Sequence, residues 1–274
     1  MEDKNNMVQD FLLKIKSNKK YKTISDMIVI REIYNYLKKN PKVSDVNKQS
    51  IKDIRKILHR LYSSYQIGKK NKKEKLLIEL RKNPSDINTI NKILSLSISS
   101  KERLNHYKEA YETIFKITKS PRSIIDLGCG LNPISYVYMG TKSLDYNCYD
   151  IDENDIQFLN DYFGMMKKYG LNGKAKILDI KDIEKISNLP DSDIIFMFKL
   201  LDIINTKSKK PGEEIINLLI EKTKFIIVSF STNTLGGRPM NIPRRKGFEF
   251  MLERNNLKYQ TFNIPNEIFY IISK

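Results

Sequence analysis

The sequence predicts an α/β fold, in which a mainly parallel, seven-stranded sheet follows an all-helical N-terminal extension. Three observations support this prediction. Apolar residues recur at helical spacing up to residue 95, short apolar runs alternate with helical segments from Ser123 onward, and a glycine-rich turn follows the first of those runs. We therefore expect two domains, at residues 1–98 and 99–274.

The extension is predicted to be helical because its apolar residues are three or four positions apart and because Pro41 and Pro84 separate its periodic segments. Two stripes stand out: Val8, Phe11, Leu12 and Ile15, then Ile51, Ile54, Leu58 and Leu61. A further amphipathic segment, residues 103–117, leads into the second domain.

Alternating strands and helices are predicted after that segment. The strands are Ser123–Asp126, Tyr146–Tyr149, Ala175–Leu178, Ile194–Met197, Phe225–Ser229, Tyr259–Ile264 and Ile268–Ile272. The helices are Pro133–Met139, Glu153–Lys168, Gly212–Lys222 and Arg244–Asn255. Residues 265–267 join the last two strands as a hairpin, and a terminal antiparallel hairpin distinguishes methyltransferases that use S-adenosylmethionine (SAM) from dinucleotide dehydrogenases.

Positive charge is concentrated in the first third of the chain. The 274 residues include 49 Lys and Arg against 32 Asp and Glu, a net charge of +17. Residues 1–100 hold 23 basic and 10 acidic residues, net +13, which leaves net +4 for the rest. A genome rich in A and T would enrich the whole chain in Lys, Asn and Ile, but it would not concentrate the charge in this way. The pattern indicates a polyanion-binding extension, with RNA as the expected partner.

Cysteine and histidine are too scarce for a disulfide framework or a zinc site, because the chain has only Cys129, Cys148 and two histidines. We expect no bound metal. The first residues show no signal-peptide pattern, and no apolar run reaches the roughly 18 residues of a membrane span. We expect a cytoplasmic monomer.

The glycine-rich turn is the strongest sign of a cofactor site. Asp126 ends an apolar strand, and Gly128 and Gly130 follow it just before a helix. Glycines leave room for a ligand against the main chain, and Asp126 could accept from the amino group of the cofactor or order a bridging water. The arrangement resembles the first motif of class I SAM-dependent methyltransferases. A dinucleotide fingerprint would need a third glycine where Pro133 stands.

Two further strands are predicted to end in carboxylates. Asp150, with Asp152 close behind it, lies about 20 residues after the glycine turn, where nucleotide-binding sheets place an acid on a ribose diol. Asp179 follows the third strand, where methyltransferases hold the adenine amino group. Arg103 could bind the methionine carboxylate of SAM through a bidentate contact. Alternatively, residues 99–103 have only a structural role and form the start of a helix, with Ser99 or Ser100 as its N-cap and Glu102 as a supporting capping residue.

Several segments resemble the 16S ribosomal RNA guanine methyltransferases that confer aminoglycoside resistance. The similarity lies in Ser99-Ser100-Lys101-Glu102-Arg103-Leu104, Asp126-Leu127-Gly128-Cys129-Gly130-Leu131-Asn132-Pro133, Phe198-Lys199-Leu200-Leu201, the stretch from Ser229 to Arg238, and Leu58-His59-Arg60-Leu61-Tyr62-Ser63-Ser64-Tyr65. It extends over most of the chain. The pattern departs from the family after Arg238, because residues 239–243 intervene before the next basic helix.

The resemblance implies a class I, Rossmann-like SAM-dependent methyltransferase. Its extension would dock on the small ribosomal subunit, and it would methylate the 7-position nitrogen of a decoding-site guanine, potentially giving aminoglycoside resistance. The residues implied to bind SAM, beside Asp126 and Gly130 above, are Arg103, Gly128, Asp150, Ile151, Asp152, Asp179, Ile180 and Leu200. Lys199, Arg238 and Met240 would face the target base.

The residues limit the chemistry independently. Methylation at carbon 5 of a pyrimidine needs a cysteine nucleophile, and Cys129 and Cys148 are predicted to lie in the cofactor loop and inside a strand. Methylation of an amino group usually involves an Asn/Asp-Pro-Pro-aromatic motif, where this chain has Phe198-Lys199-Leu200-Leu201. A guanine 7-position nitrogen carries a lone pair and no proton, so orientation and electrostatics suffice.

A basic segment with interleaved aromatic residues is predicted to bind folded RNA. It comprises Arg55, Lys56, Arg60, Lys69, Lys70, Lys72 and Lys73 around Tyr62 and Tyr65. The four lysines that follow Gly68 are expected to be exposed. The tyrosines could instead pack helices together. Deleting residues 1–95 would then remove RNA recognition and leave SAM binding intact.

Other functions remain open from the residues alone. One is a methyltransferase for another ribosomal or transfer RNA base, and another is a non-catalytic RNA-binding or ribosome-assembly protein with the same fold. A methyltransferase for small molecules is disfavoured, because it would not need the basic extension.

Overall fold

The structure is a computed structural model that describes residues 2–59, 70–205, 211–233, 238, 240 and 244–274. The chain forms two compact units. One comprises Met1–Gln66 with Ile151–Asn154, and the other comprises Ile67–Asp150 with Asp155–Lys274.

Among its described residues the first unit contains the helices α1 (Glu2–Lys16), α2 (Asp26–Lys39) and α3 (Lys48–Leu58). Both predicted stripes face its core: Val8, Phe11, Leu12 and Ile15 are buried together with Ile54 and Leu58. Leu61 lies outside the described residues. Asn47 caps α3, because its side chain accepts from Ser50 N over 2.9 Å while the Ser50 hydroxyl accepts from Asn47 N.

A short segment from the middle of the chain packs in this same unit. The backbone N–H of Ser25 donates to the carbonyl of Ile151 over 3.0 Å, and Glu153 N–H donates to the carbonyl of Thr23 over 2.9 Å. The Thr23 hydroxyl also donates to the carboxylate of Asp152. The four residues that follow the second strand of the sheet are therefore held by the N-terminal helical unit.

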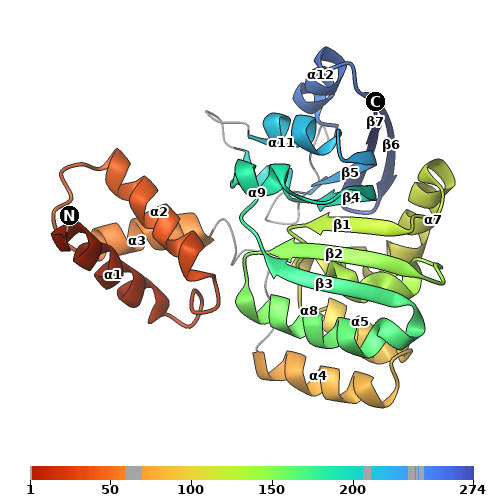
Figure 1. The fold of residues 1–274 in the computed structure, drawn as a ribbon, viewed down its shortest axis with the longest axis horizontal. Coiled ribbons are helices and arrows are strands. Elements are labelled where there is room, and N and C mark those ends of the chain that lie inside the picture. Colours follow the sequence, from red (N-terminus) through yellow and green to blue (C-terminus); the bar gives the residue numbers. More distant parts are fainter. Residues whose placement is uncertain (1, 60–69, 206–210, 234–237, 239, 241–243) are drawn as a thin grey trace. The chain divides into compact units, whose positions relative to one another are not determined.

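The second unit is built on one sheet with the strand order β3-β2-β1-β4-β5-β7-β6. The strands are β1 (Ser123–Leu127), β2 (Leu144–Asp150), β3 (Leu171–Ile177), β4 (Ser192–Phe198), β5 (Thr223–Ser231), β6 (Lys258–Ile264) and β7 (Glu267–Ser273). Strands β1 to β5 pair in parallel, and β7 pairs antiparallel with both β5 and β6. Each predicted strand overlaps a strand of the sheet, and the terminal hairpin is present (Figure 1), but β3 begins four residues before the predicted Ala175 and β7 begins at Glu267, which was assigned to the hairpin connection.

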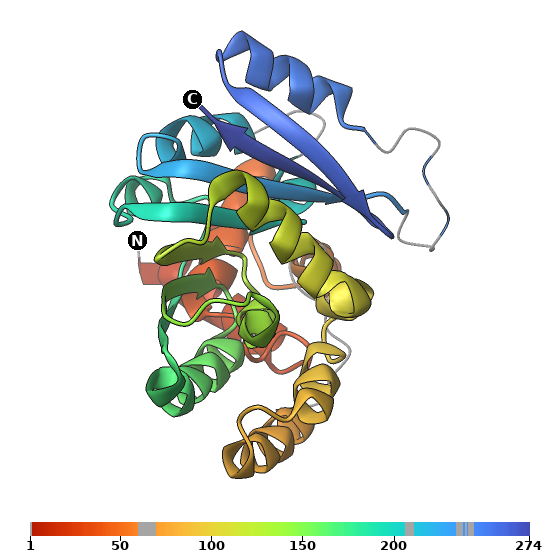
Figure 2. The same ribbon diagram turned by 90° about the vertical axis from the view of Figure 1, so that its right-hand side faces the viewer.

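Helices cover both faces of the sheet. One face packs against α4 (Lys70–Lys82), α5 (Ile87–Leu94), α7 (Tyr107–Thr118), the 3-10 helix η3 (Asn132–Tyr138) and α8 (Glu153–Met166). The other packs against α9 (Ile183–Ser187), α10 (Leu201–Ile204), α11 (Gly212–Leu219) and α12 (Lys246–Arg254). Between α5 and α7 run α6 (Ile98–Arg103) and η2 (Leu104–His106), and η4 (Lys167–Tyr169) follows α8. Figure 2 shows α12 beside the β6–β7 hairpin.

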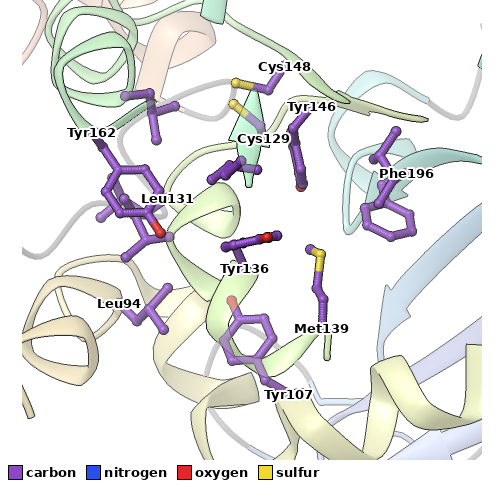
Figure 3. Packing of buried hydrophobic residues seen from close by; sticks show 14 of the residues in the cluster. Leu94, Tyr107, Cys129, Leu131, Tyr136, Met139, Tyr146, Cys148, Tyr162 and Phe196 are labelled. Carbon is purple, nitrogen blue, oxygen red and sulfur yellow. The ribbon is translucent and has the colours of Figure 1, made fainter. Parts of the chain in front are cut away.

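Helices α4 and α5 share the core of the sheet and not that of the N-terminal helices. Leu80, Ile90 and Ile93 are completely buried in one cluster with Tyr107 and Tyr146. Figure 3 shows Leu94 in this packing, with Tyr107, Tyr136 and Tyr146. The compact units therefore divide near residue 66, whereas the sequence pattern placed the boundary at residue 98. Helical periodicity shows that a face is apolar, but it does not show which core that face joins.

Two local predictions need correction. The segment predicted as a helix at Pro133–Met139 is the 3-10 helix η3, and α6 begins after Ser97, so neither Ser99 nor Ser100 is its cap. Within the described residues, no helix is both long and apolar enough to cross a membrane.

Candidate active site

The glycine turn is joined by hydrogen bonds to the end of β2. The backbone N–H groups of Gly128 and Cys129 donate to the carbonyl of Tyr149 over 2.9 and 3.1 Å. The N–H of Gly130 donates to the Asp150 carboxylate over 2.7 Å. The predicted ribose-binding acid and the predicted cofactor turn therefore lie together at the carboxyl edge of the parallel strands.

Both glycines have backbone conformations that other residues rarely adopt. The φ angles of Gly128 and Gly130 are +65° and +49°. A Cβ atom at Gly128 would lie 2.7 Å from Cδ1 of Leu200, whereas one at Gly130 would meet no atom within 4 Å. Leu200 thus contacts the first glycine, and the turn leaves open space beside the second. That space, with a carboxylate next to it, fits a ligand that approaches the main chain.

Asp126 is a buried support of the turn. It is 1% exposed and accepts hydrogen bonds from Asn132 Nδ2 over 2.9 Å and from the Tyr146 hydroxyl over 2.7 Å. Burial raises the pKa of Asp126 to about 7, against the hydrogen bonds from Asn132 and Tyr146 that lower it. In this structure the carboxylate binds protein donors, and it links the first strand to the residue that follows the glycine turn.

The other acids predicted at the cofactor site differ in their surroundings. Asp152 is 1% exposed and, with the half-buried Ile151, belongs to the N-terminal helical unit, where Thr23 donates to it. Asp179 follows β3 and is buried, and its carboxylate accepts from Lys181 N over 3.0 Å. Ile180, beside it, is half-buried.

Arg103 lies in a buried ion pair at the end of α6. Its Nε and Nη2 donate to the two carboxylate oxygens of Glu267 over 3.0 and 2.7 Å, and its Nη1 donates to Asn132 Oδ1 over 3.1 Å. The guanidinium carbon lies 4.7 Å from the ring centroid of Phe198. Burial acts most strongly and lowers the pKa of Arg103, but the charge of Glu267, its hydrogen bonds and the neighbouring tyrosines together raise the pKa above its usual value. Arg103 is therefore a permanent cation in a fixed orientation.

Lys199 belongs to the same charged cluster. It is 4% exposed, and its Nζ lies 2.6 Å from a carboxylate oxygen of Glu102 and 3.6 Å from one of Glu267. Its φ angle of +55° is rare for a side chain other than glycine, and its N–H donates to the carbonyl of Ser229 over 3.0 Å. Lys199 is thus a buried, paired cation and not a solvated surface charge.

Sequence reasoning missed Glu267, Asn132 and Ser229, all buried in this cluster. Glu267 was interpreted only as part of the hairpin connection. Its antiparallel strand begins at the edge where the parallel strands end, so the first residue of β7 lies at the site. The predicted hairpin could have revealed that placement, because a residue at the start of an antiparallel strand shares an edge with residues at the ends of its parallel neighbours.

Arg238 and Met240 are described outside this cluster. Arg238 is exposed, and Met240 is half-buried, with its N–H donating to the carbonyl of Thr232 over 2.8 Å. Arg245 Nη1 lies 3.4 Å from the Met240 sulfur. Residues 234–237, 239 and 241–243 lie outside the described part of the chain.

The predicted RNA-binding residues do not form one exposed set. Lys56 and Lys72 are exposed, whereas Arg55 is half-buried and donates to the carbonyls of Lys14 and Ile15 at the end of α1. Lys73 is 6% exposed and forms an ion pair with the buried Asp155, which contradicts the expectation of a fully exposed run. Arg60, Lys69, Tyr62 and Tyr65, and the side chain of Lys70, lie outside the described residues.

The sheet order, the antiparallel β7 and the open glycine turn with its neighbouring acid together define a class I methyltransferase, the fold class whose methyl donor is SAM. Residues 20–271 match the family model described as "Ribosomal RNA methyltransferase (FmrO)". The chain therefore belongs to the FmrO family of ribosomal RNA methyltransferases, and the prediction of an enzyme of this class is confirmed.

Relatives and solved structures agree with this placement. A 16S rRNA (guanine(1405)-N(7))-methyltransferase of Proteus mirabilis is 28% identical over 293 aligned positions that cover 100% of both chains. One of the same name from Micromonospora echinospora is 28% identical over 188 positions, 68% of this chain and 66% of the relative. The fold is similar to that of the 16S rRNA methyltransferase RmtF in complex with S-adenosyl-L-homocysteine, with a TM-score of 0.80, 23% identity and 98% coverage of each chain. The 16S rRNA methylase RmtB follows with a TM-score of 0.73, 21% identity and coverage of 97% and 98%.

Proposed function

We propose that this enzyme methylates the 7-position nitrogen of a guanine in the decoding region of 16S ribosomal RNA, within the small ribosomal subunit. The observation that carries the proposal is the match to relatives named for that reaction, one of which aligns with the whole chain. The site adds physical support, because the open space beside Gly130 adjoins the Asp150 carboxylate on β2 and the chemistry needs no general base.

The residues at the sheet edge fit SAM. Asp150 would accept from the ribose hydroxyls and Asp179 from the adenine amino group, while Leu200, Ile151 and Ile180 would supply apolar contacts. Arg103 would bind the methionine carboxylate. Its guanidinium carries five N–H groups, of which four hydrogen bonds go to Glu267, Asn132 and Tyr107, so one contact remains within its donor capacity.

When bound, SAM supplies a methyl group activated by a sulfonium charge. Transfer to the guanine nitrogen would use the lone pair of that nitrogen and would release neutral S-adenosylhomocysteine as the leaving group. The positive charge moves to the purine, and no proton is transferred. The protein has to hold the base in line and exclude water.

Lys199, Arg238 and Met240 are the residues we assign to the base. The charge of Lys199 is balanced by Glu102 and Glu267, so it can donate to a guanine acceptor without opposing the positive charge that develops on the ring. Arg238 is exposed and would clamp the extruded nucleotide. Exposed lysines among residues 1–98, such as Lys56 and Lys72, would contact the phosphates of the subunit. Modification of the decoding site would then lower aminoglycoside binding in the cytoplasm of the producing cell.

The test is methylation of isolated small subunits and of free 16S RNA with SAM, followed by chemical cleavage at 7-methylguanine and primer extension. We expect one new cleavage site in the decoding region with the subunit as substrate. A Lys199→Met variant should reduce its intensity. Cleavage at a different base would reassign the target, and no cleavage together with unaltered SAM binding would favour a non-catalytic role.

A further inference from the structure

Glu267 contacts three other members of the buried charged cluster, Arg103, Lys199 and Ser229. It is the first residue of β7, it is 1% exposed, and its register partner on β5 is Ser231. Its carboxylate accepts two hydrogen bonds from Arg103, over 3.0 and 2.7 Å, and one from the Ser229 hydroxyl. Burial acts to raise the pKa of Glu267, but the charges of Arg103 and Lys199 hold it below its usual value. The group is therefore an anion at neutral pH.

The two cations on Glu267 come from different parts of the chain and have different proposed roles. Arg103 ends α6, and its other terminal nitrogen donates to Asn132, which in turn donates to Asp126 at the end of β1. Lys199 directly follows β4, and its Nζ lies 3.6 Å from Oε2 of Glu267. One carboxylate thus lies between the arginine assigned to the cofactor and the lysine assigned to the base.

The surroundings of this carboxylate leave its partners few alternative positions. Ser229 donates to Glu267 through its hydroxyl and accepts the Lys199 N–H at both its carbonyl and its hydroxyl, each over 3.0 Å. The Arg103 guanidinium is stacked on Phe198. A buried cation that loses its anion keeps its desolvation cost, so it must move toward another partner or toward water. Removal of the Glu267 charge should therefore displace Arg103, and it should leave Lys199 held by Glu102 alone, 2.6 Å from its Nζ, so that Lys199 shifts toward that residue.

We propose that Glu267 is a positioning residue that fixes Arg103 toward SAM and Lys199 toward the target base, and so couples the two halves of the site. This inference rests on the proposed function for the roles of the two cations. It assigns to the last strand of the sheet a part in methyl transfer, although Glu267 itself need touch neither substrate.

The test compares Glu267→Gln with a matched control, Glu249→Gln. Glu249 is also buried, and it also accepts a bidentate pair of hydrogen bonds from an arginine, Arg244, over 2.8 and 2.9 Å, together with one from Tyr270. Both substitutions keep the side-chain shape and remove one negative charge. We expect Glu267→Gln to weaken SAM binding about tenfold and to lower the single-turnover rate at saturating SAM about tenfold, since hydrogen bonds to charged groups are strong. Glu249→Gln should change neither by more than about twofold, because the described hydrogen bonds of the Glu249 carboxylate are to Arg244 and Tyr270, neither of which we assign to the cofactor or the base.

A double substitution distinguishes positioning from general stability. In a Lys199→Met background, Glu267→Gln should reduce the single-turnover rate much less than in the wild type, because one of its two targets is already missing. Glu267→Asp, which keeps the charge, should recover part of the lost SAM affinity. Equal behaviour of Glu267→Gln and Glu249→Gln, or effects of Glu267→Gln and Lys199→Met that multiply, would overturn the proposal.

Two further readouts keep the inference separate from the proposed function. Calorimetric SAM binding needs no RNA, so the link from Glu267 to Arg103 can be tested even where the wild type modifies a different base. If Glu267→Gln does not fold, Ser229→Ala replaces it: this variant deletes one hydrogen bond to Glu267 and should lower the single-turnover rate severalfold at unchanged thermal stability. An unchanged rate in Ser229→Ala would count against the proposal.

Discussion

The Asp150 carboxylate accepts a hydrogen bond of 2.7 Å from the N–H of Gly130, and this bond connects the end of the second strand to the turn after the first. The acid that we assign to the ribose is thus fixed by the turn that makes room for the cofactor. The two parts of the cofactor site depend on each other in the absence of any ligand.

Replacing Asp150 with alanine should weaken SAM binding by about 1.5 to 3 kcal/mol, because a charge-assisted hydrogen bond is lost. Asp145→Ala is the control. Asp145 lies on the same strand, is exposed, and accepts from Asn172 over 2.8 Å away from the turn. Isothermal titration of both variants measures the difference, and equal affinities would remove Asp150 from the site.

The buried Asp126 should make stability depend on pH. Its pKa is about 7 in the folded protein, well above the usual value of 3.8. The folded state therefore binds this proton more tightly, so the stability that it contributes is complete below pH 3.8 and is lost as the pH rises through 7. The free energy of unfolding of the wild type, compared with Asp126→Asn, should decrease by on the order of 2 kcal/mol between pH 5 and 8. Urea titrations at the two pH values give this difference, and a constant difference would show that Asp126 is ionised throughout.

Neighbouring lysines on α4 should respond differently to substitution. Lys73 is buried in an ion pair with Asp155, so Lys73→Ala removes the cation of a buried pair and should cost about 3 to 5 kcal/mol of stability. Lys72 is exposed, and Lys72→Ala should change stability by less than about 0.5 kcal/mol. Thermal and urea unfolding of the two variants measure these changes in stability. Similar stabilities would mean that the ion pair with Asp155 is unimportant.

Exposed lysines assigned to RNA should affect the salt dependence of subunit binding. If Lys56 and Lys72 contact phosphates, replacing both with alanine should reduce the slope of log affinity against log salt by about 0.7 to 0.9 for each. Replacing Lys116, which is exposed on α7, removes one positive charge from a different surface and should leave the slope unchanged. A double variant with the wild-type slope would place the docking face on other residues.

Two N-terminal deletions, of residues 1–95 and of residues 1–66, should differ in whether the remaining chain folds. Loss of residues 1–95 would strip Leu80, Ile90 and Ile93 from the core that covers one face of the sheet, and each fully buried side chain of this kind contributes about 1.5 to 3 kcal/mol. The expectation that this deletion leaves SAM binding intact does not fit that packing. We expect it to yield an unfolded protein by circular dichroism, whereas deletion of residues 1–66 should retain a cooperative unfolding transition.

Local pattern was sufficient to predict most of the sheet, because strands such as β1, β4 and β7 contain short apolar runs. Strand β3 includes Asn172, Gly173 and Lys174 and was predicted only from Ala175 onward. The glycine turn and Asp150 were predictable as well, since both lie at fixed positions relative to those strands. The burial of Lys73 was not, because it depends on Asp155, which is 82 positions away in the sequence.

The charged cluster also depends on contacts between residues that are far apart in the sequence, and these were not predicted. Lys199 and Arg103 were identified one by one, but their common partner Glu267 is 164 positions from Arg103 and was hidden in a turn. A single sequence indicates which side chains are available for a site. It does not indicate which of them satisfy one another, because that depends on how the strands are ordered in the sheet.

The place of β7 between β5 and β6 also bears on when the enzyme becomes active. Glu267, which completes the charged cluster, enters the sheet beside a strand made more than 30 residues earlier. A chain emerging during synthesis folds from its N-terminal end, so the glycine turn and the basic extension are made before this strand. A molecule that ends before β7 would thus carry the glycine turn and the basic extension without the anion that orients the two cations.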